Sequence, residues 1–146
     1  CDLIVAVPEA RFSLPEVKVG LVPDSGGIFR LSRRMPPALA RELLLTGRPM
    51  DADEAARWGV VNRVVERDHL LADARALAAE IEAAAPLATR AVKAILAATE
   101  ELGVERAFAA LRDGSVPAYD RAMASPDAEE GARAFAEGRD PVWRGE

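Results

Sequence analysis

Residues 13–31 read SLPEVKVGLVPDSGGIFRL, and this stretch places a glutamate directly after a proline at the end of a short apolar run. Pro15 has no backbone N–H and a fixed φ, so it ends the preceding strand and gives Glu16 a defined exit. Asp24 then stands just ahead of a helical pattern over residues 25–35, which is the usual place of an N-cap. The stretch therefore predicts a strand, an acid at its end and the start of a helix.

The residues on either side of this stretch predict further short strands. Residues 2–7 form an apolar run, residues 11–14 form a second one, and residues 60–66 are rich in valine and predict a strand or extended segment. The first run has no polar lead-in and no partner strand nearby. Because a lone strand leaves its backbone groups unpaired, we expect the chain to be the C-terminal part of a longer protein.

Helical patterns with clear end signals fill the rest of the chain. Asp51 and Glu54 have the spacing of a capping box, while Ser125 is expected to cap the last helix and Gly138 to end it. The change from strands to helices predicts a boundary near residue 66. The predicted helices lie at 37–46, 51–58, 68–84, 87–100, 104–123 and 126–137.

The composition excludes several classes of protein. The 146 residues carry a formal net charge of −5, which argues against a general nucleic-acid binder and against binding to an anionic membrane surface. A single cysteine, Cys1, and a single histidine, His69, leave no disulfide framework and no metal site built on these residue types. No apolar run is long enough to span a membrane, and a reducing, cytoplasmic setting is expected.

Five segments together resemble one known family. The family is the crotonase superfamily, the enoyl-CoA hydratases and isomerases, and the segments occur in its order and with its usual spacing over nearly the whole chain. Within that superfamily, VPDSGG, RWGVVNRVV and FAEGRDPVWRG look most like the carnitinyl-CoA dehydratases. The five segments are CDLIVAV, ARFSLPEVKVGLVPDSGG, LLLTGRPMDADEAARWGVVNRVV, APLATRAVKAI and SPDAEEGARAFAEGRDPVW.

The resemblance implies a fold and an assembly. The fold is α/β, the C-terminal part of a crotonase (ClpP-like) fold with two or three short strands plus helices, followed by an all-helical trimerisation tail. Residues 1–66 would then belong to the α/β core and residues 67–146 to the oligomerisation region of a homotrimer or hexamer. A first catalytic glutamate and another oxyanion-hole N–H would lie in a segment before Cys1.

The resemblance also implies catalytic residues. Glu16 matches the second catalytic glutamate of the family in its Pro-Glu motif, and the alternative is a surface glutamate in a turn. Asp24 stands where simple hydratases often have glycine, and it is either an acid/base or substrate-orienting group or only a helix N-cap. Pro23, beside it, is expected to line the substrate site.

Binding residues follow from the same resemblance. Gly26 and Gly27 are expected to allow close backbone packing beside the ligand, unless they are ordinary helix-start glycines. Tyr119 matches an aromatic position against the adenine of coenzyme A, with packing between helices as the alternative. The family often has a phosphate-binding lysine where this chain has Gly138, a departure that weakens this contact unless Arg139 replaces it.

The implied reaction is the addition or elimination of water at the 2,3-position of a CoA thioester, with an acyl-CoA substrate. No metal and no separate cofactor are expected, since coenzyme A is part of the substrate. Neither nucleic acid nor a membrane is expected as a partner. Two alternatives stay open: an enoyl-CoA double-bond isomerase, for which one carboxylate suffices, and an inactive assembly module.

Overall fold

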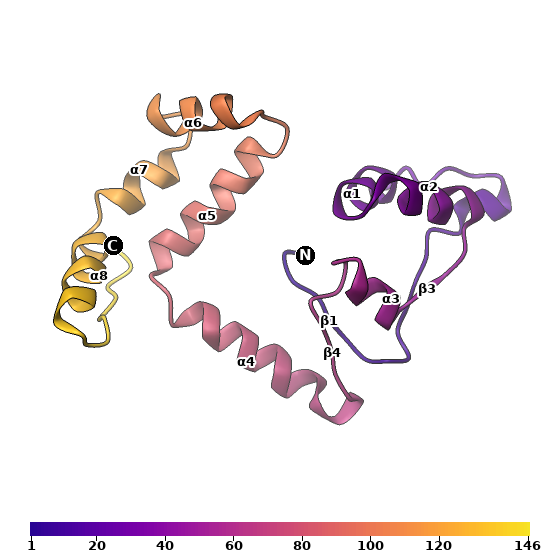
Figure 1. The fold of residues 1–146 in the computed structure, drawn as a ribbon, viewed down its shortest axis with the longest axis horizontal. Coiled ribbons are helices and arrows are strands. Elements are labelled where there is room, and N and C mark those ends of the chain that lie inside the picture. The colour runs from indigo at the N-terminus through magenta and orange to yellow at the C-terminus, as the bar shows by residue number, and fades with distance from the viewer. The chain divides into compact units, whose positions relative to one another are not determined.

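The computed structural model describes residues 1–146, and these divide into two units, Cys1–Ala76 and Leu77–Glu146. Figure 1 labels the α-helices of both units and the strands β1, β3 and β4. The division falls inside the helix α4 (Leu70–Glu82) and so lies later in the chain than the boundary predicted from the change of pattern near residue 66.

Two pairs of very short strands organise the first unit. β1 (Val5–Ala6) pairs in parallel with β4 (Arg63–Val64), and β2 (Arg11–Phe12) pairs antiparallel with β3 (Met50–Asp51). Parallel strands need a long crossover, which here is the whole stretch between β1 and β4. The strands predicted at 2–7 and 11–14 therefore exist but are shorter.

The first strand has a partner within this chain, which corrects the expectation of a lone strand. Its pairing extends beyond the two strand residues, because Asn62 bonds Ile4 twice: the Ile4 N–H donates to Asn62 Oδ1 at 2.8 Å, and the Asn62 N–H donates to the Ile4 carbonyl at 2.8 Å. The partner was hidden by its distance along the sequence, since residues 60–66 lie far from residues 2–7.

Two helices of the first unit begin or end at the residues that the sequence predicts. α2 (Pro37–Thr46) starts with a proline and ends at Gly47, whose φ of 59° is left-handed. α3 (Ala52–Arg57) is capped by Asp51, whose carboxylate accepts the Glu54 N–H at 2.8 Å. The Glu54 carboxylate binds Arg48 instead of closing the capping box.

The prediction that Asp24 caps the following helix is wrong. α1 (Gly27–Arg34) starts later than predicted, and its N-cap is Gly26, with a φ of 89° and no side-chain cap hydrogen bond. The left-handed conformation at Gly26 separates residue 24 from the first helical turn, because the chain must complete a turn over 24–26 before the helix begins. Asp24 is exposed in that turn.

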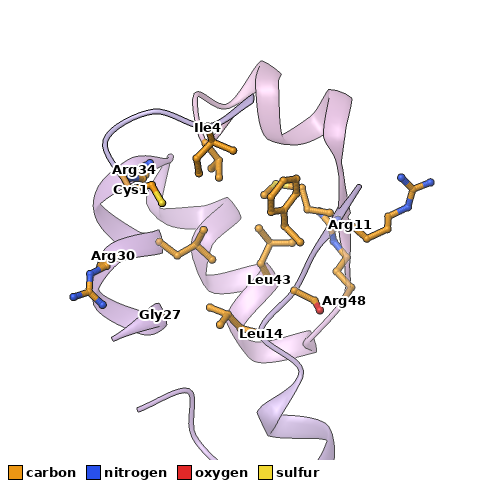
Figure 2. Close-up of a pocket in the computed structure, with 14 residues that line it drawn as sticks. Cys1, Ile4, Arg11, Leu14, Gly27, Arg30, Arg34, Leu43 and Arg48 are labelled. Atoms are coloured by element: carbon orange, nitrogen blue, oxygen red, sulfur yellow. The ribbon is translucent and has the colours of Figure 1, made fainter. Parts of the chain in front are cut away.

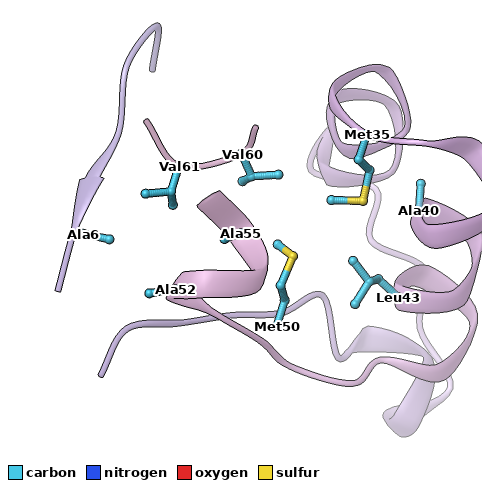
Figure 3. Close-up of a cluster of buried hydrophobic side chains, with 9 residues drawn as sticks. All are labelled: Ala6, Met35, Ala40, Leu43, Met50, Ala52, Ala55, Val60 and Val61. Carbon is cyan, nitrogen blue, oxygen red and sulfur yellow. The ribbon is translucent and has the colours of Figure 1, made fainter. Parts of the chain in front are cut away.

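Small and medium-sized side chains form the core of the first unit. They come from β1, the C-cap of α1, α2, β3, α3 and the chain after α3. Figure 3 shows Met50 between α2 and α3. Met50 is only 2% exposed. The buried set is Ala6, Met35, Ala40, Leu43, Met50, Ala52, Ala55, Val60 and Val61.

Helices are the only regular secondary structure of the second unit. It contains α5 (Pro86–Thr99), α6 (Val104–Arg112), α7 (Pro117–Met123) and α8 (Pro126–Glu137). A single helix over 104–123 was predicted, and this was wrong. The Ser115 N–H donates to Asp113 Oδ1 at 2.9 Å in a turn after α6, and Pro117 starts α7 as a separate helix.

The end of the chain folds back onto α8. Ser125 caps the helix and Gly138 ends it, as predicted. The Asp127 carboxylate accepts the Arg144 N–H at 2.7 Å and the Gly145 N–H at 2.9 Å. The Trp143 indole N–H donates to the Ala83 carbonyl at 2.8 Å, so residues 139–146 are held by specific hydrogen bonds.

The Glu130 carboxylate adds a pH-sensitive contact to this terminal segment. It accepts from Arg139 Nη1 at 2.6 Å and from the Val142 N–H at 3.1 Å. These hydrogen bonds, that of Arg139 first, lower the pKa of Glu130 from its ordinary 4.5 to about 2. Because the folded pKa is the lower one, the contact stabilises the segment fully above pH 4.5 and is lost as the pH falls towards 2.

We therefore expect Trp143 to report on this loss in a Trp58→Phe background, where it is the remaining tryptophan. Its emission should shift to longer wavelength as the pH is lowered through this range. The Glu130→Gln variant should already be shifted at neutral pH and change little on acidification. An emission maximum that stays constant down to pH 2 in the parent would contradict this assignment.

Candidate active site

Glu16 is the first residue of a short 3₁₀ helix, η1 (Glu16–Val19). The turn is closed by two backbone hydrogen bonds: the Lys18 N–H donates to the Pro15 carbonyl at 2.9 Å, and the Leu21 N–H donates to the Glu16 carbonyl at 2.9 Å. The backbone at Glu16 is therefore fixed locally. The preceding strand β2 ends at Phe12, before Pro15, and the predicted role of Pro15 in directing Glu16 stays a prediction.

The side chain of Glu16 is half-buried, and its Oε2 is buried without any hydrogen-bond partner. A buried carboxylate oxygen without a donor is costly, so most such oxygens in folded proteins find one. An ordinary surface glutamate in a turn would have both oxygens in water. Glu16 Oε2 differs from such a residue because it is buried and accepts no hydrogen bond.

Asp24 and Pro23 lie after an exposed apolar segment. Val19, Leu21 and Val22 are 73%, 63% and 64% exposed, whereas Pro23 is buried. Asp24 makes only one side-chain contact, a weak one at 3.5 Å from Ser25 Oγ. No hydrogen bond joins Asp24 to Glu16, so the structure does not itself pair the two carboxylates.

Gly26 and Gly27 leave room for side chains of the chain itself. A Cβ at Gly26 would collide with the Arg30 guanidinium, and a Cβ at Gly27 would lie 2.6 Å from Leu14 Cδ2. The Arg30 guanidinium is the end of a flexible side chain and can move aside, so at Gly26 the φ of 89° is what favours glycine, whereas Gly27 is explained by its close packing against Leu14. Their predicted place beside a ligand stays a prediction.

A cavity of about 500 Å³ opens beside the residues that precede Glu16. Figure 2 shows Ile4, Leu14 and Leu43 around it, while Arg11 and Arg30 extend outward from its rim. The lining comes from β2, α1, α2, β3 and the segment before β1, and it is mostly apolar. Sequence patterns did not reveal this cavity, because its walls are far apart along the chain.

Arg48 also lines the cavity, and it ties α2 to α3. Its guanidinium donates to both Glu54 oxygens, at 2.8 and 3.0 Å, and to Glu42 Oε1 at 2.6 Å. The Glu54 hydrogen bonds are the main reason that the pKa of Arg48 is raised, and the same bonds lower the pKa of Glu54. Sequence analysis missed this network, whose role is to brace the site's scaffold.

The predicted coenzyme A contacts lie in the second unit. Tyr119 is half-buried on α7. Arg139 is held by Glu130, at 2.6 and 3.1 Å, and by Glu137 at 2.6 Å, and these bonds raise the pKa of its guanidinium. A phosphate would have to compete with these two carboxylates for Arg139. In this structure Arg139 holds the terminal segment, and its contact with a ligand stays a prediction.

No group of three or more histidine, cysteine, aspartate or glutamate side chains comes together in the geometry of a metal site. None of the helices has both the length and the apolar character needed to cross a membrane.

Comparisons with known proteins give the family. The enoyl-CoA hydratase/isomerase family model matches residues 1–146. Carnitinyl-CoA dehydratases from Citrobacter koseri and Salmonella typhimurium are each 51% identical over 144 residues, covering 99% of this chain and 55% of those proteins. The chain thus spans about half the length of the curated relatives it matches.

Solved structures agree with this match. The enoyl-CoA hydratase of Mycobacterium tuberculosis H37Rv superimposes with a TM-score of 0.89 at 43% identity, covering 100% of this chain and 56% of that one. The enoyl-CoA hydratase of Bacillus anthracis gives a TM-score of 0.90 at 31% identity, covering 100% of this chain and 55% of that one. The fold and the sequence agree, and the chain belongs to the enoyl-CoA hydratase/isomerase family, the crotonase superfamily.

Proposed function

We propose that this chain is part of an acyl-CoA hydratase/dehydratase, a lyase that adds or eliminates water at the 2,3-position of a CoA thioester. The observation that carries the proposal is the buried, unpartnered Oε2 of Glu16, at the position that matches the family's catalytic glutamate. The 51% identity to carnitinyl-CoA dehydratases favours a carnitinyl-CoA-like substrate.

The chemistry suits a carboxylate in this setting. When water adds to a 2-enoyl thioester, a C–O bond forms at C3, negative charge moves onto the thioester oxygen, and a proton is delivered to C2. Backbone N–H donors aimed at that oxygen are each worth about 2.7–4 kcal/mol in comparable sites. Glu16 Oε2 has no donor of its own, so it is available to exchange a proton with the water or with C2.

Asp24 is proposed as a second acid/base or as a group that orients the substrate. Its exposure and its lack of a capping hydrogen bond support this, because the competing structural role has been removed. Pro23, Gly26 and Gly27 would complete the substrate side of the site. Tyr119 and Arg139 remain proposed contacts for the adenine and a phosphate, with Arg139 exchanging its carboxylate partners for the ligand.

The rest of the site is proposed to come from a segment that this chain does not contain. The first catalytic glutamate and another oxyanion-hole donor belong to it by resemblance, and the chain alone would then be inactive. The coverage of the curated relatives, 55% of their length, supports this division.

The test is the loss of enoyl-thioester absorbance with crotonobetainyl-CoA and crotonyl-CoA, using the full gene product. Turnover of both, with the higher kcat/KM for crotonobetainyl-CoA, is expected. A rise in absorbance with a 3-enoyl-CoA, without hydration of either substrate, would support the isomerase alternative instead. If a folded protein catalysed none of these three reactions, the remaining alternative would be the inactive assembly module.

We also propose that the second unit mediates assembly into a trimer or hexamer in the cytoplasm. Large apolar side chains exposed on several helices support this, because subunit association would remove their apolar area from water. Light scattering of the full gene product tests it, and a monodisperse monomer would refute it. The exposed side chains include Leu96 on α5, Phe108 on α6, Met123 on α7 and Phe135 on α8.

A further inference from the structure

Gly47 lies at the end of α2 against the turn that carries Glu16. Its N–H donates to the Leu43 carbonyl at 2.9 Å, and its φ is 59°. A Cβ placed on Gly47 would lie 3.2 Å from Pro15 Cα, 3.2 Å from Val17 Cγ2 and 3.3 Å from Lys18 Cε. Pro15 and Val17 immediately flank Glu16, and Lys18 belongs to the same short helix.

These three neighbours differ in how easily they can move. The Val17 and Lys18 atoms belong to side chains, which can rotate. Pro15 Cα is backbone, its ring fixes its φ, and its carbonyl is already used to close the turn at Lys18. A separation of 3.2 Å is shorter than the usual 3.5–4.0 Å contact between carbon atoms. A side chain at Gly47 would thus shift Pro15, and with it the residue that follows.

We propose that Gly47 is a positioning residue for Glu16: its missing side chain lets the end of α2 hold η1 so that Oε2 stays in its buried, unpartnered place. This inference rests on the proposed function of Glu16. Gly47 does more than end a helix, because Gly59 has a comparable φ of 75° and nothing within 4 Å of the Cβ it would carry.

Gly59 therefore provides a matched control for the strain of a left-handed alanine. In the full gene product, Gly47→Ala and Gly59→Ala should both lower thermal stability, because alanine is disfavoured at positive φ. Only Gly47→Ala should lower kcat, by about tenfold, since a misplacement of 1 Å can cost about 100-fold. Its KM should stay within about twofold, because the substrate-binding groups are not moved.

A second pair covers the case in which Gly47→Ala does not fold. Asparagine tolerates a left-handed backbone better but places a Cβ at the same point, so Gly47→Asn should keep the kcat defect while Gly59→Asn keeps normal turnover. Equal kcat values for the Gly47 and Gly59 variants would overturn the inference. If Glu16→Gln were also fully active, the proposed function of Glu16 would be refuted as well. If Glu16→Gln were inactive, only the proposed role of Gly47 would be refuted.

Discussion

Glu16→Gln is expected to lower kcat for hydration by about 10²–10⁴-fold, the usual contribution of a general acid or base, with little change in KM. Glutamine keeps the size and shape of the side chain but cannot exchange a proton. The substitution also removes no hydrogen bond at Oε2, because that atom has no partner. Stability should therefore be retained or slightly increased, which separates a catalytic effect from misfolding.

Glu9→Gln is the matched control for this change. Glu9 is exposed, and its carboxylate lies 3.5 Å from Arg67, in an ion pair of the kind that contributes little to stability. We expect kcat of this variant within about twofold of the parent. Steady-state kinetics and thermal melts of the two variants make the comparison, and a Glu16→Gln enzyme with parental kcat would remove Glu16 from the mechanism.

Asp127→Ala should destabilise the second unit by about 3 kcal/mol. The carboxylate is 2% exposed and accepts two backbone N–H groups of the terminal segment, and a hydrogen bond to a charged group is worth about 1.5–3 kcal/mol. Hydrogen exchange should lose its protection at Arg144 and Gly145. The denaturation midpoint of the full gene product should fall accordingly.

Two further variants separate the causes of this loss. Glu129→Ala removes an exposed carboxylate from the same first turn of α8, so it measures the helix-dipole contribution alone, about 0.3–1 kcal/mol. Asp127→Asn keeps one acceptor oxygen and should fall between the alanine variant and the parent. Full protection of the Arg144 and Gly145 amides in Asp127→Ala would show that the terminal segment is held by other contacts.

Sequence patterns predicted the helix ends correctly where the residues that cause them are adjacent to the helix. The caps Asp51 and Ser125 and the stop at Gly47 lie beside the helices that they end, so short windows of sequence contain the whole cause. Asp24 failed as a cap because Gly26, two residues later, completes a turn before the helix starts. A single acceptor side chain therefore does not predict a helix start when a left-handed glycine stands between that side chain and the first residue of the helix.

Features that depend on residues far apart in the chain could not be predicted from sequence patterns. The pairing of β1 with β4 and the walls of the cavity depend on residues brought together only by the folded chain. For Glu16, resemblance supplied the proposed role, but nothing in the local pattern predicted that one oxygen is buried without a donor. The packing of Gly47 against Pro15 was not predicted for the same reason, since about thirty residues separate Gly47 from the turn that it contacts.

The parallel pairing of Val5 with Arg63 has a consequence for synthesis. The hydrogen-bonded partners Ile4 and Asn62 stand 58 residues apart, so the ribosome needs about 3–12 s between making one and the other at about 5–20 residues per second. During that interval β1 lacks the edge that β4 supplies, and an exposed strand edge is a site for association with other chains. Chaperone capture of nascent chains should therefore concentrate on lengths at which β1 has emerged and β4 has not.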